Sequence, residues 1–228
     1  MIRVTENLRK IRDLLAETAE NAGRNRDSVK LLAVSKKQPI TAILEAVSAG
    51  QRDFGENQVQ EGIEKITEID NPDLTWHFIG HLQTNKTRLV AEHFSWVHSV
   101  DRLKVARRLS QQRPESLGDL NVCVQVNVDD EASKSGASLD EAADLAATIV
   151  DLPRLRLRGL MCLPAIREDF EEQRQPFRRL RELGDQLRSA GMPIDTLSMG
   201  MSDDYRAAIY EGSTIVRIGT AVFGPRDA

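Results

Sequence analysis

The stretch LLAVSKKQPITAILEAVSAG, residues 31–50, contains one full repeat of the pattern that decides the fold. Residues 31–35 form a short apolar run that is typical of a buried strand, and the run stops at Lys36 and Lys37. Residues 40–50 place apolar side chains at i, i+3 and i+4 and end in glycine, as an amphipathic helix does. A strand followed by such a helix predicts a βα unit.

The same alternation of strand and helix continues along the whole chain. Further runs with strand character lie between helical patterns, at residues 52–55, 76–80, 96–100, 121–128, 156–163, 194–200 and 213–220. Eight βα repeats favour a closed parallel barrel over an open sheet, so we predict an α/β fold, a (β/α)8 TIM-like barrel. An extra amphipathic helix is expected from about residue 4 to residue 22 and is predicted to close the bottom of the barrel.

The composition indicates an ordinary globular protein of 228 residues. No Ser/Gly-rich linker divides the chain, so we expect a single domain over residues 1–228. The net charge of -4, from 35 acidic and 31 basic residues, argues against a nucleic-acid partner. No 18-residue apolar run and no signal-peptide pattern occur, and we therefore expect a cytoplasmic protein with no membrane partner.

The cysteines and histidines show no spacing typical of metal ligands, so no metal site is expected. Cys123 and Cys162 lie in apolar strand-like runs and are interpreted as buried thiols. His77 and His98 lie within predicted strands and are interpreted as packing residues. His81 lies in a loop without a paired carboxylate and is interpreted as a bystander.

Polar and small residues follow the predicted strands at the end of a barrel where active sites are built. Lys36 follows the first strand and Asn57 follows the second. The last two strands lead into residues that suit a phosphate, namely Ser198, Gly200, Ser202, Gly219 and Thr220. Small residues let backbone N–H groups approach a phosphate, and hydroxyls add donors. The alternative is a pair of ordinary Gly/Ser loops.

A lysine facing a phosphate site suggests a phosphorylated aldehyde bound as a Schiff base. Desolvation at the end of an apolar strand lowers the pKa of a lysine toward the neutral form that attacks a carbonyl. Both faces of a barrel strand are expected to be apolar, so parity along the strand does not choose between Lys36 and Lys37. Two alternatives stay open, a solvated strand-end lysine and an aldolase-type enzyme acting on a sugar phosphate.

Seven motifs, in order and over nearly the whole chain, carry a family resemblance. They are LLAVSK, FGENQVQE, WHFIGHLQTNK, SKSG, LRLRGLM, LSMGMSDD and STIVRIGTAVFG. Together they resemble the pyridoxal 5'-phosphate (PLP) homeostasis proteins, which are similar to the N-terminal barrel of alanine racemase, a fold-type III PLP-binding fold. The resemblance implies that PLP is the cofactor and that the protein has a role in intracellular PLP (vitamin B6) homeostasis.

The resemblance also implies roles for single residues. Lys36 would form the Schiff base, and Arg217 would meet the pyridine nitrogen. Ser202, Gly219 and Thr220 would hold the phosphate with Ser198 and Gly200 nearby, and Asn57 and Met201 would line the pocket. Lys86 and Lys134 match basic positions of the family to which we assign no role. Family members often carry a second lysine two positions after the first, where this chain has Gln38, with Lys37 adjacent instead.

The alternative function is a small PLP-dependent amino-acid racemase, which needs an acid or base on both faces of the substrate. In alanine racemases, as the resemblance implies, a tyrosine of a further C-terminal domain supplies the second base. The chain ends at Ala228 and we expect no such domain, while Tyr205 and Tyr210 are expected on a helix. A guanidinium at Arg217 keeps the pyridine nitrogen unprotonated, which weakens the ring as an electron sink. We therefore expect PLP binding without efficient turnover, in a monomer whose candidate partners are PLP-dependent apoenzymes.

Overall fold

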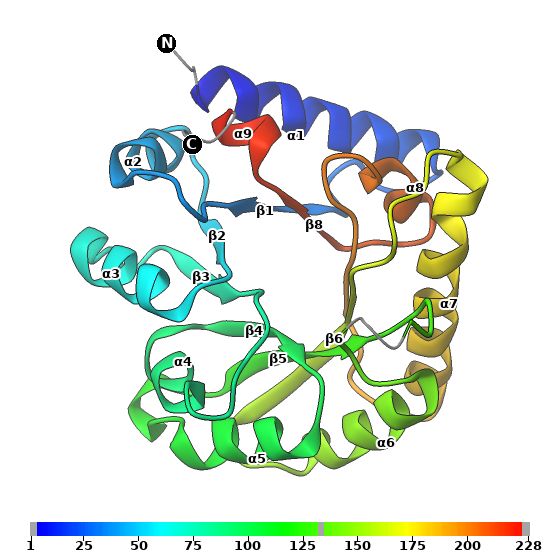
Figure 1. Cartoon of the computed structure of the whole chain (residues 1–228). Coiled ribbons are helices and arrows are strands. Elements are labelled where there is room, and N and C mark those ends of the chain that lie inside the picture. Colours follow the sequence, from blue (N-terminus) through cyan, green and yellow to red (C-terminus); the bar gives the residue numbers. More distant parts are fainter. Residues whose placement is uncertain (1–3, 132–134, 225–228) are drawn as a thin grey trace.

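Eight parallel strands close into a barrel in the order in which they occur along the chain (Figure 1). The computed structural model describes residues 4–131 and 135–224. The strands are β1 (Lys30–Val34), β2 (Asp53–Glu56), β3 (Thr75–Phe78), β4 (Trp96–Val100), β5 (Leu120–Val126), β6 (Leu155–Cys162), β7 (Thr196–Ser198) and β8 (Ile215–Ile218). β8 pairs with β1, with Arg217 beside Leu32, and this pairing closes the barrel. The predicted (β/α)8 fold is confirmed.

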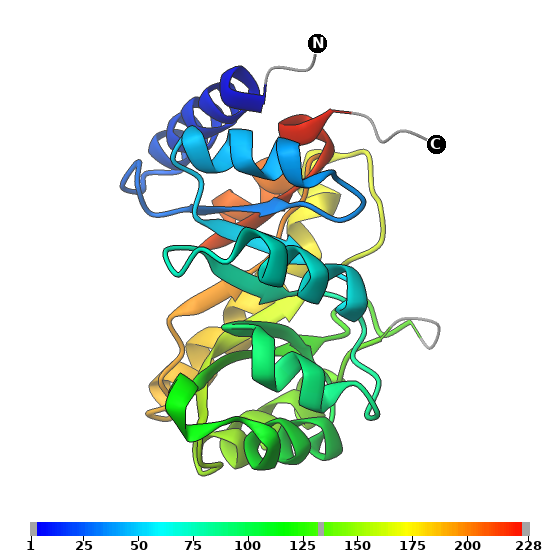
Figure 2. The same cartoon turned by 90° about the vertical axis from the view of Figure 1, so that its left-hand side faces the viewer.

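Helices surround the barrel and bury its outer face. They are α2 (Ile40–Ser48), α3 (Val59–Ile69), α4 (Thr87–His93), α5 (Leu103–Gln112), α6 (Leu139–Val150), α7 (Phe170–Ser189), α8 (Tyr205–Tyr210) and α9 (Thr220–Phe223), with a short 3-10 helix, η1 (Glu115–Leu117). Figure 2 shows α2 and α3 on the outer side of the first strands. Phe54, Phe78 and Phe177 are fully buried in the core. Ser138 and Glu141 form a capping box that starts α6.

The N-terminal helix α1 (Val4–Asn21) lies in the outer ring and packs against α2, α8 and α9 (Figure 1). The prediction that it closes the bottom of the barrel is therefore wrong. The reason is chemical, because its buried stripe, which includes Leu8 and Leu15, needs an apolar partner. Lys30 and Asp53, at the first positions of β1 and β2, make the bottom of the barrel polar. The helix that follows β8, α9, has only 4 residues and is too short to cover the outer face of that strand. The helix α1 packs beside α9 and covers this part of the barrel instead.

The barrel interior is more polar than its outer face. His77, His98, Ser198 and Arg217 come from β3, β4, β7 and β8, and each is at most 4% exposed. They are joined by hydrogen bonds, which removes most of the cost of burying them. The expectation that both faces of the strands are apolar fails at these positions.

Candidate functional site

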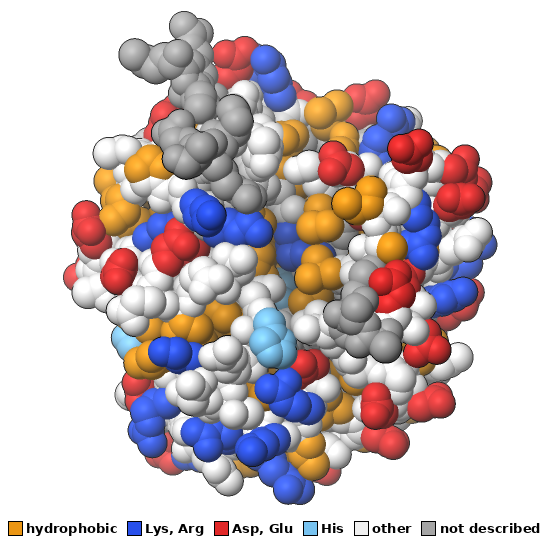
Figure 3. Space-filling view, viewed as in Figure 1, with side chains coloured by type: hydrophobic (Ala, Val, Ile, Leu, Met, Phe, Trp, Pro, Cys, Tyr) orange, Lys and Arg blue, Asp and Glu red, His pale blue; other side chains and the backbone are white. Residues whose placement is uncertain are grey.

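A cavity of about 770 Å³ opens at the C-terminal end of the barrel. Its lining includes most of the predicted cofactor-binding residues, namely Lys36, Asn57, Met201, Ser202, Arg217, Gly219 and Thr220. The other lining residues are Val34, Ile79, Gly80, His81, Leu163, Asp203 and Ala221. Figure 3 shows a hollow near the centre of one face of the molecule, with basic and hydrophobic side chains around it. Segments far apart in the sequence thus meet where the strand ends were expected to form a site.

The structure distinguishes the two lysines that follow β1. Lys36 lines the cavity, whereas Lys37 is exposed and does not. The backbone of Lys37 has a φ of 57°, in the left-handed region that few residues other than glycine adopt. Its N–H donates to the carboxylate of Glu61 on α3, which holds this turn in place. The chain therefore presents Lys36, and not Lys37, to the cavity.

A buried polar cluster supports the loop that carries Lys36. The hydroxyl of Ser35 donates to Glu56 Oε1 at 2.6 Å. Lys65 Nζ lies 2.9 Å from Glu56 Oε1 and 2.6 Å from Glu61 Oε1, and it also donates to the carbonyl oxygen of Ser35 at 2.7 Å. Burial raises the pKa of Glu56, while the charge of Lys65 opposes that rise. The cluster ties the end of β1 to α3.

The loops after β7 and β8 provide the small residues of the cavity. The backbone N–H groups of Ser202 and Gly219 donate no hydrogen bond to any residue that the structure describes. Gly200 has a φ of 97°, and a Cβ there would lie 2.7 Å from the Cβ of Ala208. Gly200 therefore allows the backbone of this turn to pack closely against α8. Its carbonyl oxygen accepts a hydrogen bond from the N–H of Arg217. Gly200 is not among the lining residues.

Arg217 reaches the cavity from inside the barrel. Its Nη1 donates to the carbonyl oxygen of Ser198 at 2.6 Å and to Ser198 Oγ at 2.8 Å, and its Nη2 donates to the carbonyl oxygen of Cys162 at 2.8 Å. Burial lowers the pKa of Arg217. The Nε–H group donates no hydrogen bond within the described residues, so part of the guanidinium is available to a ligand. Ser198 itself does not line the cavity, because its side chain points toward the barrel interior.

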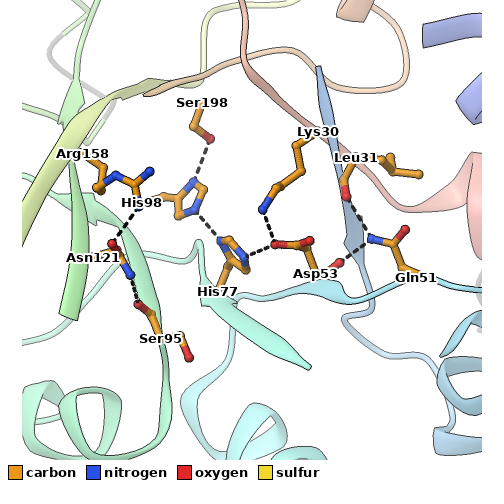
Figure 4. Close-up of polar contacts among 10 residues, drawn as sticks. All are labelled: Lys30, Leu31, Gln51, Asp53, His77, Ser95, His98, Asn121, Arg158 and Ser198. Carbon is orange, nitrogen blue, oxygen red and sulfur yellow. Dashed lines mark hydrogen bonds and ion pairs between the residues drawn. The ribbon is translucent and has the colours of Figure 1, made fainter. Parts of the chain in front are cut away.

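Ser198 belongs to a row of buried polar groups, which we call the histidine chain and which consists of Asp53, His77, His98, Ser198 and Arg217. Figure 4 shows the part of it from Asp53 to Ser198. Ser198 Oγ lies 2.7 Å from His98 Nδ1, and His98 Nε2 lies 2.9 Å from His77 Nδ1. His77 Nε2 lies 3.1 Å from Asp53 Oδ1. The interpretation of both histidines as packing residues therefore misses their polar role. One available signal was their position within predicted barrel strands, where half of the side chains must point inward.

The remaining predicted residues have simpler surroundings. Cys123 and Cys162 are buried thiols, as predicted, and burial raises the pKa of Cys123 to about 12. Lys86 is exposed outside the cavity, and Lys134 lies outside the described residues. His81 lines the cavity mouth and is exposed.

Neither tyrosine contributes to the cavity. Tyr205 and Tyr210 lie at the two ends of α8 and are absent from its lining. No helix in residues 4–131 and 135–224 combines the length and the apolar character that a bilayer span requires.

Comparison with known proteins assigns the family. The family model described as "Alanine racemase, N-terminal domain" matches residues 4–227. A pyridoxal phosphate homeostasis protein of Pseudomonas aeruginosa is 55% identical over 227 residues, which cover 100% of this chain and 97% of that protein. The chain belongs to the pyridoxal phosphate homeostasis protein family.

Solved structures agree with membership of the pyridoxal phosphate homeostasis protein family. PipY of Synechococcus elongatus PCC7942, solved with PLP bound, has a TM-score of 0.84 and 37% identity, over 97% of this chain and 100% of that chain. An alanine racemase of Clostridium difficile 630 has a TM-score of 0.75 at 16% identity, over 99% of this chain and 57% of that chain. The second likeness concerns the fold alone, which the homeostasis family and the racemases share.

Proposed function

We propose that this chain binds PLP in the cavity at the C-terminal end of its barrel, holds it as a Schiff base on Lys36, and serves in intracellular PLP homeostasis. The observation that carries the proposal is the presence of Lys36, Arg217 and Ser202 in one cavity. The names of the relatives and the structure of PipY with PLP bound support it.

The residues of the cavity fit a phosphorylated pyridine aldehyde. A volume of about 770 Å³ lies within the range of about 300–1,000 Å³ that is usual for small-molecule sites. Lys36 offers an amine, and the backbone N–H groups of Ser202 and Gly219 suit the oxygens of a phosphate. A Cβ at Gly219 would lie 3.1 Å from the carbonyl oxygen of Val34, so glycine lets the backbone after β8 run close to the end of β1. Asn57, Met201 and Thr220 complete the proposed contacts.

Arg217 decides which chemistry the site favours. Bound PLP supplies an electron sink for a carbanion next to an amino-acid nitrogen. A guanidinium does not give up its proton near neutral pH, so Arg217 can only donate to the pyridine nitrogen that we propose it faces. That nitrogen then stays unprotonated and the ring attracts electrons less strongly. The site therefore favours holding and releasing PLP over rapid turnover.

The racemase alternative needs an acid or base on each face of a bound amino acid. Apart from Lys36 and Arg217, the ionisable side chains of the described lining are His81 and Asp203, and both are exposed. Exposed groups at a cavity mouth are poorly placed to hold a proton away from water. The lining thus supports a binding protein better than a racemase.

The first test is the visible absorption of the purified protein after PLP is added. We expect a visible absorption band, typical of a PLP Schiff base, that borohydride abolishes while it attaches the cofactor to Lys36. Lys36→Ala should lose the band, and Lys37→Ala is the matched control because its side chain lies outside the cavity. Loss of the band in Lys37→Ala but not in Lys36→Ala would contradict the assignment.

The second test separates binding from turnover. The loaded protein is incubated with alanine and a panel of other amino acids in deuterated water, and α-hydrogen exchange is followed by NMR. A coloured protein without rapid exchange supports PLP homeostasis. Rapid exchange with loss of stereochemistry would make the protein a racemase.

We further propose that the chain works as a single-domain monomer in the cytoplasm and supplies PLP to apoenzymes. Sedimentation of the loaded protein should give one species near the chain mass of 25.5 kDa. The loaded protein should reactivate a PLP-dependent apoenzyme when a phosphatase removes free PLP from solution. A dimeric mass, or no reactivation, would contradict the corresponding part of the proposal.

A further inference from the structure

The two ends of the histidine chain determine the direction of its hydrogen bonds. At the bottom of the barrel, the ionised carboxylate of Asp53 can only accept, so the hydrogen between it and His77 belongs to His77 Nε2. At the cavity, the guanidinium of Arg217 can only donate, so Ser198 Oγ accepts from Arg217 Nη1. Both ends therefore favour donation toward Asp53.

The middle of the chain follows from the neutral state of its rings. Burial lowers the pKa of His77 and of His98, and a neutral ring carries a single N–H. Because His77 uses its hydrogen at Nε2, its Nδ1 accepts from His98 Nε2. His98 Nδ1 then accepts the hydroxyl hydrogen of Ser198. This is the arrangement in which every buried donor meets an acceptor.

Lys30 completes the chain at the bottom of the barrel. Its Nζ lies 2.9 Å from Asp53 Oδ1, the same oxygen that His77 contacts. Burial raises the pKa of Asp53, but its contacts with His77 and Lys30 outweigh this effect. The pKa therefore lies below its usual value, and the carboxylate stays ionised. The ion pair with Lys30 thereby maintains the acceptor that orients both rings.

We propose that His77 and His98 are positioning residues that act through Ser198 to hold the Arg217 guanidinium in one orientation toward the cavity. Ser198 Oγ presents its lone pairs to Arg217 because its hydrogen is committed to His98. With Nη1 fixed on Ser198 and Nη2 on the carbonyl oxygen of Cys162, the Nε–H group is left for the ligand. This inference rests on the proposed function for the identity of the ligand that Arg217 meets.

The first experiment locates the ring hydrogens of His77 and His98 directly, in the protein without added ligand. Long-range ¹H–¹⁵N NMR on protein with labelled histidine rings distinguishes the two neutral tautomers and the imidazolium. The variants His81→Gln and His93→Gln identify the signals of His81 and His93, so the remaining signals belong to His77 and His98. At pH 7.5 we expect the Nε2–H tautomer for both His77 and His98. An Nδ1–H tautomer or an imidazolium at either ring would overturn the proposal.

The second experiment tests whether the histidine chain affects the binding of PLP in the cavity. Ser198→Ala breaks the link between His98 and Arg217, and we expect the dissociation constant for PLP to rise about tenfold, as for loss of a hydrogen bond to a charged group. The visible band should also shift. Thr196→Val is the matched control, because Thr196 is a buried residue of the same strand whose hydroxyl donates to Asp195 and to no other group within the described residues. The control should bind PLP within about twofold of the unaltered protein, as expected for a residue outside the cavity.

The outcomes separate the positioning role from the proposed function. If Ser198→Ala binds PLP like Thr196→Val, with an unchanged band, the positioning role is wrong although PLP binding stands. If the unaltered protein does not bind PLP, the proposed function fails. The tautomers of His77 and His98 then still test whether the histidine chain orients Arg217. Should Ser198→Ala fail to fold, the tautomer measurement on the unaltered protein decides alone.

Discussion

The ammonium of Lys65 lies 2.9 Å from the carboxylate of Glu56, and both groups are buried beneath the loop that carries Lys36. The same ammonium donates to the carbonyl oxygen of Ser35, directly before Lys36. A buried ion pair adds little stability over a well-packed apolar pair, but removal of one partner leaves the other charge buried and uncompensated. Lys65 therefore matters both for folding and for the placement of Lys36.

We expect Lys65→Met to lower the free energy of unfolding by about 3 to 5 kcal/mol, because it strands the carboxylate of Glu56. Urea unfolding at pH 7.5 measures this loss. Lys104→Met is the control, since Lys104 is exposed on α5 and should contribute little. Equal stabilities of the two variants would show that the loss of Lys65 does not leave a costly buried charge at Glu56.

Gly200→Ala should destabilise the protein for two separate reasons. A φ of 97° disfavours any side chain, and the added Cβ would lie 2.7 Å from the Cβ of Ala208. Gly191→Ala is the matched control, because Gly191 has a φ of 86° but nothing lies within 4 Å of the added Cβ.

In thermal or urea unfolding we expect a loss of about 1 kcal/mol for Gly191→Ala, as for backbone strain alone, and a loss of about 2 kcal/mol or more for Gly200→Ala. Only Gly200→Ala should weaken PLP binding, since the turn at Gly200 leads into Ser202 of the cavity. A similar effect of both variants on PLP binding would contradict the role of this turn.

Stability should fall as the pH drops below the ordinary pKa of histidine. Burial lowers the folded-state pKa of His77 and His98, so the unfolded chain binds protons near pH 6.5 while the folded chain does not. Their contribution is therefore fully present above about pH 6.5 and is lost below it, by up to about 1.4 kcal/mol per histidine and pH unit. Urea unfolding at pH 7.5, 6.5 and 5.5 measures the slope.

The matched control for the pH experiment is His81→Gln, because His81 is exposed at the cavity mouth. That variant should retain the pH dependence of the unaltered protein. His98→Gln should fold less stably at pH 7.5 but lose less stability on acidification. A pH dependence that is unchanged in His98→Gln would mean that other groups cause it.

The barrel could be predicted from the sequence because its signals are local. Each βα unit repeats the same pair of patterns, and the eight strands occur within a few residues of the expected positions. The place of α1 could not be predicted, because its apolar stripe shows that it is buried but not which surface buries it. That choice depends on the polar bottom of the barrel and on the short α9, which are tertiary facts.

The candidate site divides in the same way. Residues that follow strands, such as Lys36 and Ser202, were predicted because parallel strands bring their C-terminal ends together. The choice between Lys36 and Lys37 needed the backbone turn at Lys37. The histidine chain also joins residues up to 100 positions apart, such as His98 and Ser198, and no local pattern reports such pairs.

Arg217 gives the sharpest test of the cavity, because this chain contains a comparable arginine elsewhere in the barrel. Arg158 pairs with Asp195 at 2.8 Å and lies over the ring of Trp96 at 4.7 Å, but it does not line the cavity. Both arginines bond to polar groups of other barrel segments, and Arg217→Gln and Arg158→Gln each remove one positive charge from the protein.

If Arg217 binds the cofactor directly, Arg217→Gln should weaken PLP binding by about 10- to 100-fold, the loss expected for a hydrogen bond from a charged donor. Arg158→Gln should bind PLP nearly as the unaltered protein does, even where it unfolds more easily. Titration with PLP, followed by the visible band and accompanied by circular dichroism of each variant, separates affinity from folding. Equal losses in the two variants would mean that positive charge in the barrel, and not the contact made by Arg217, attracts the cofactor.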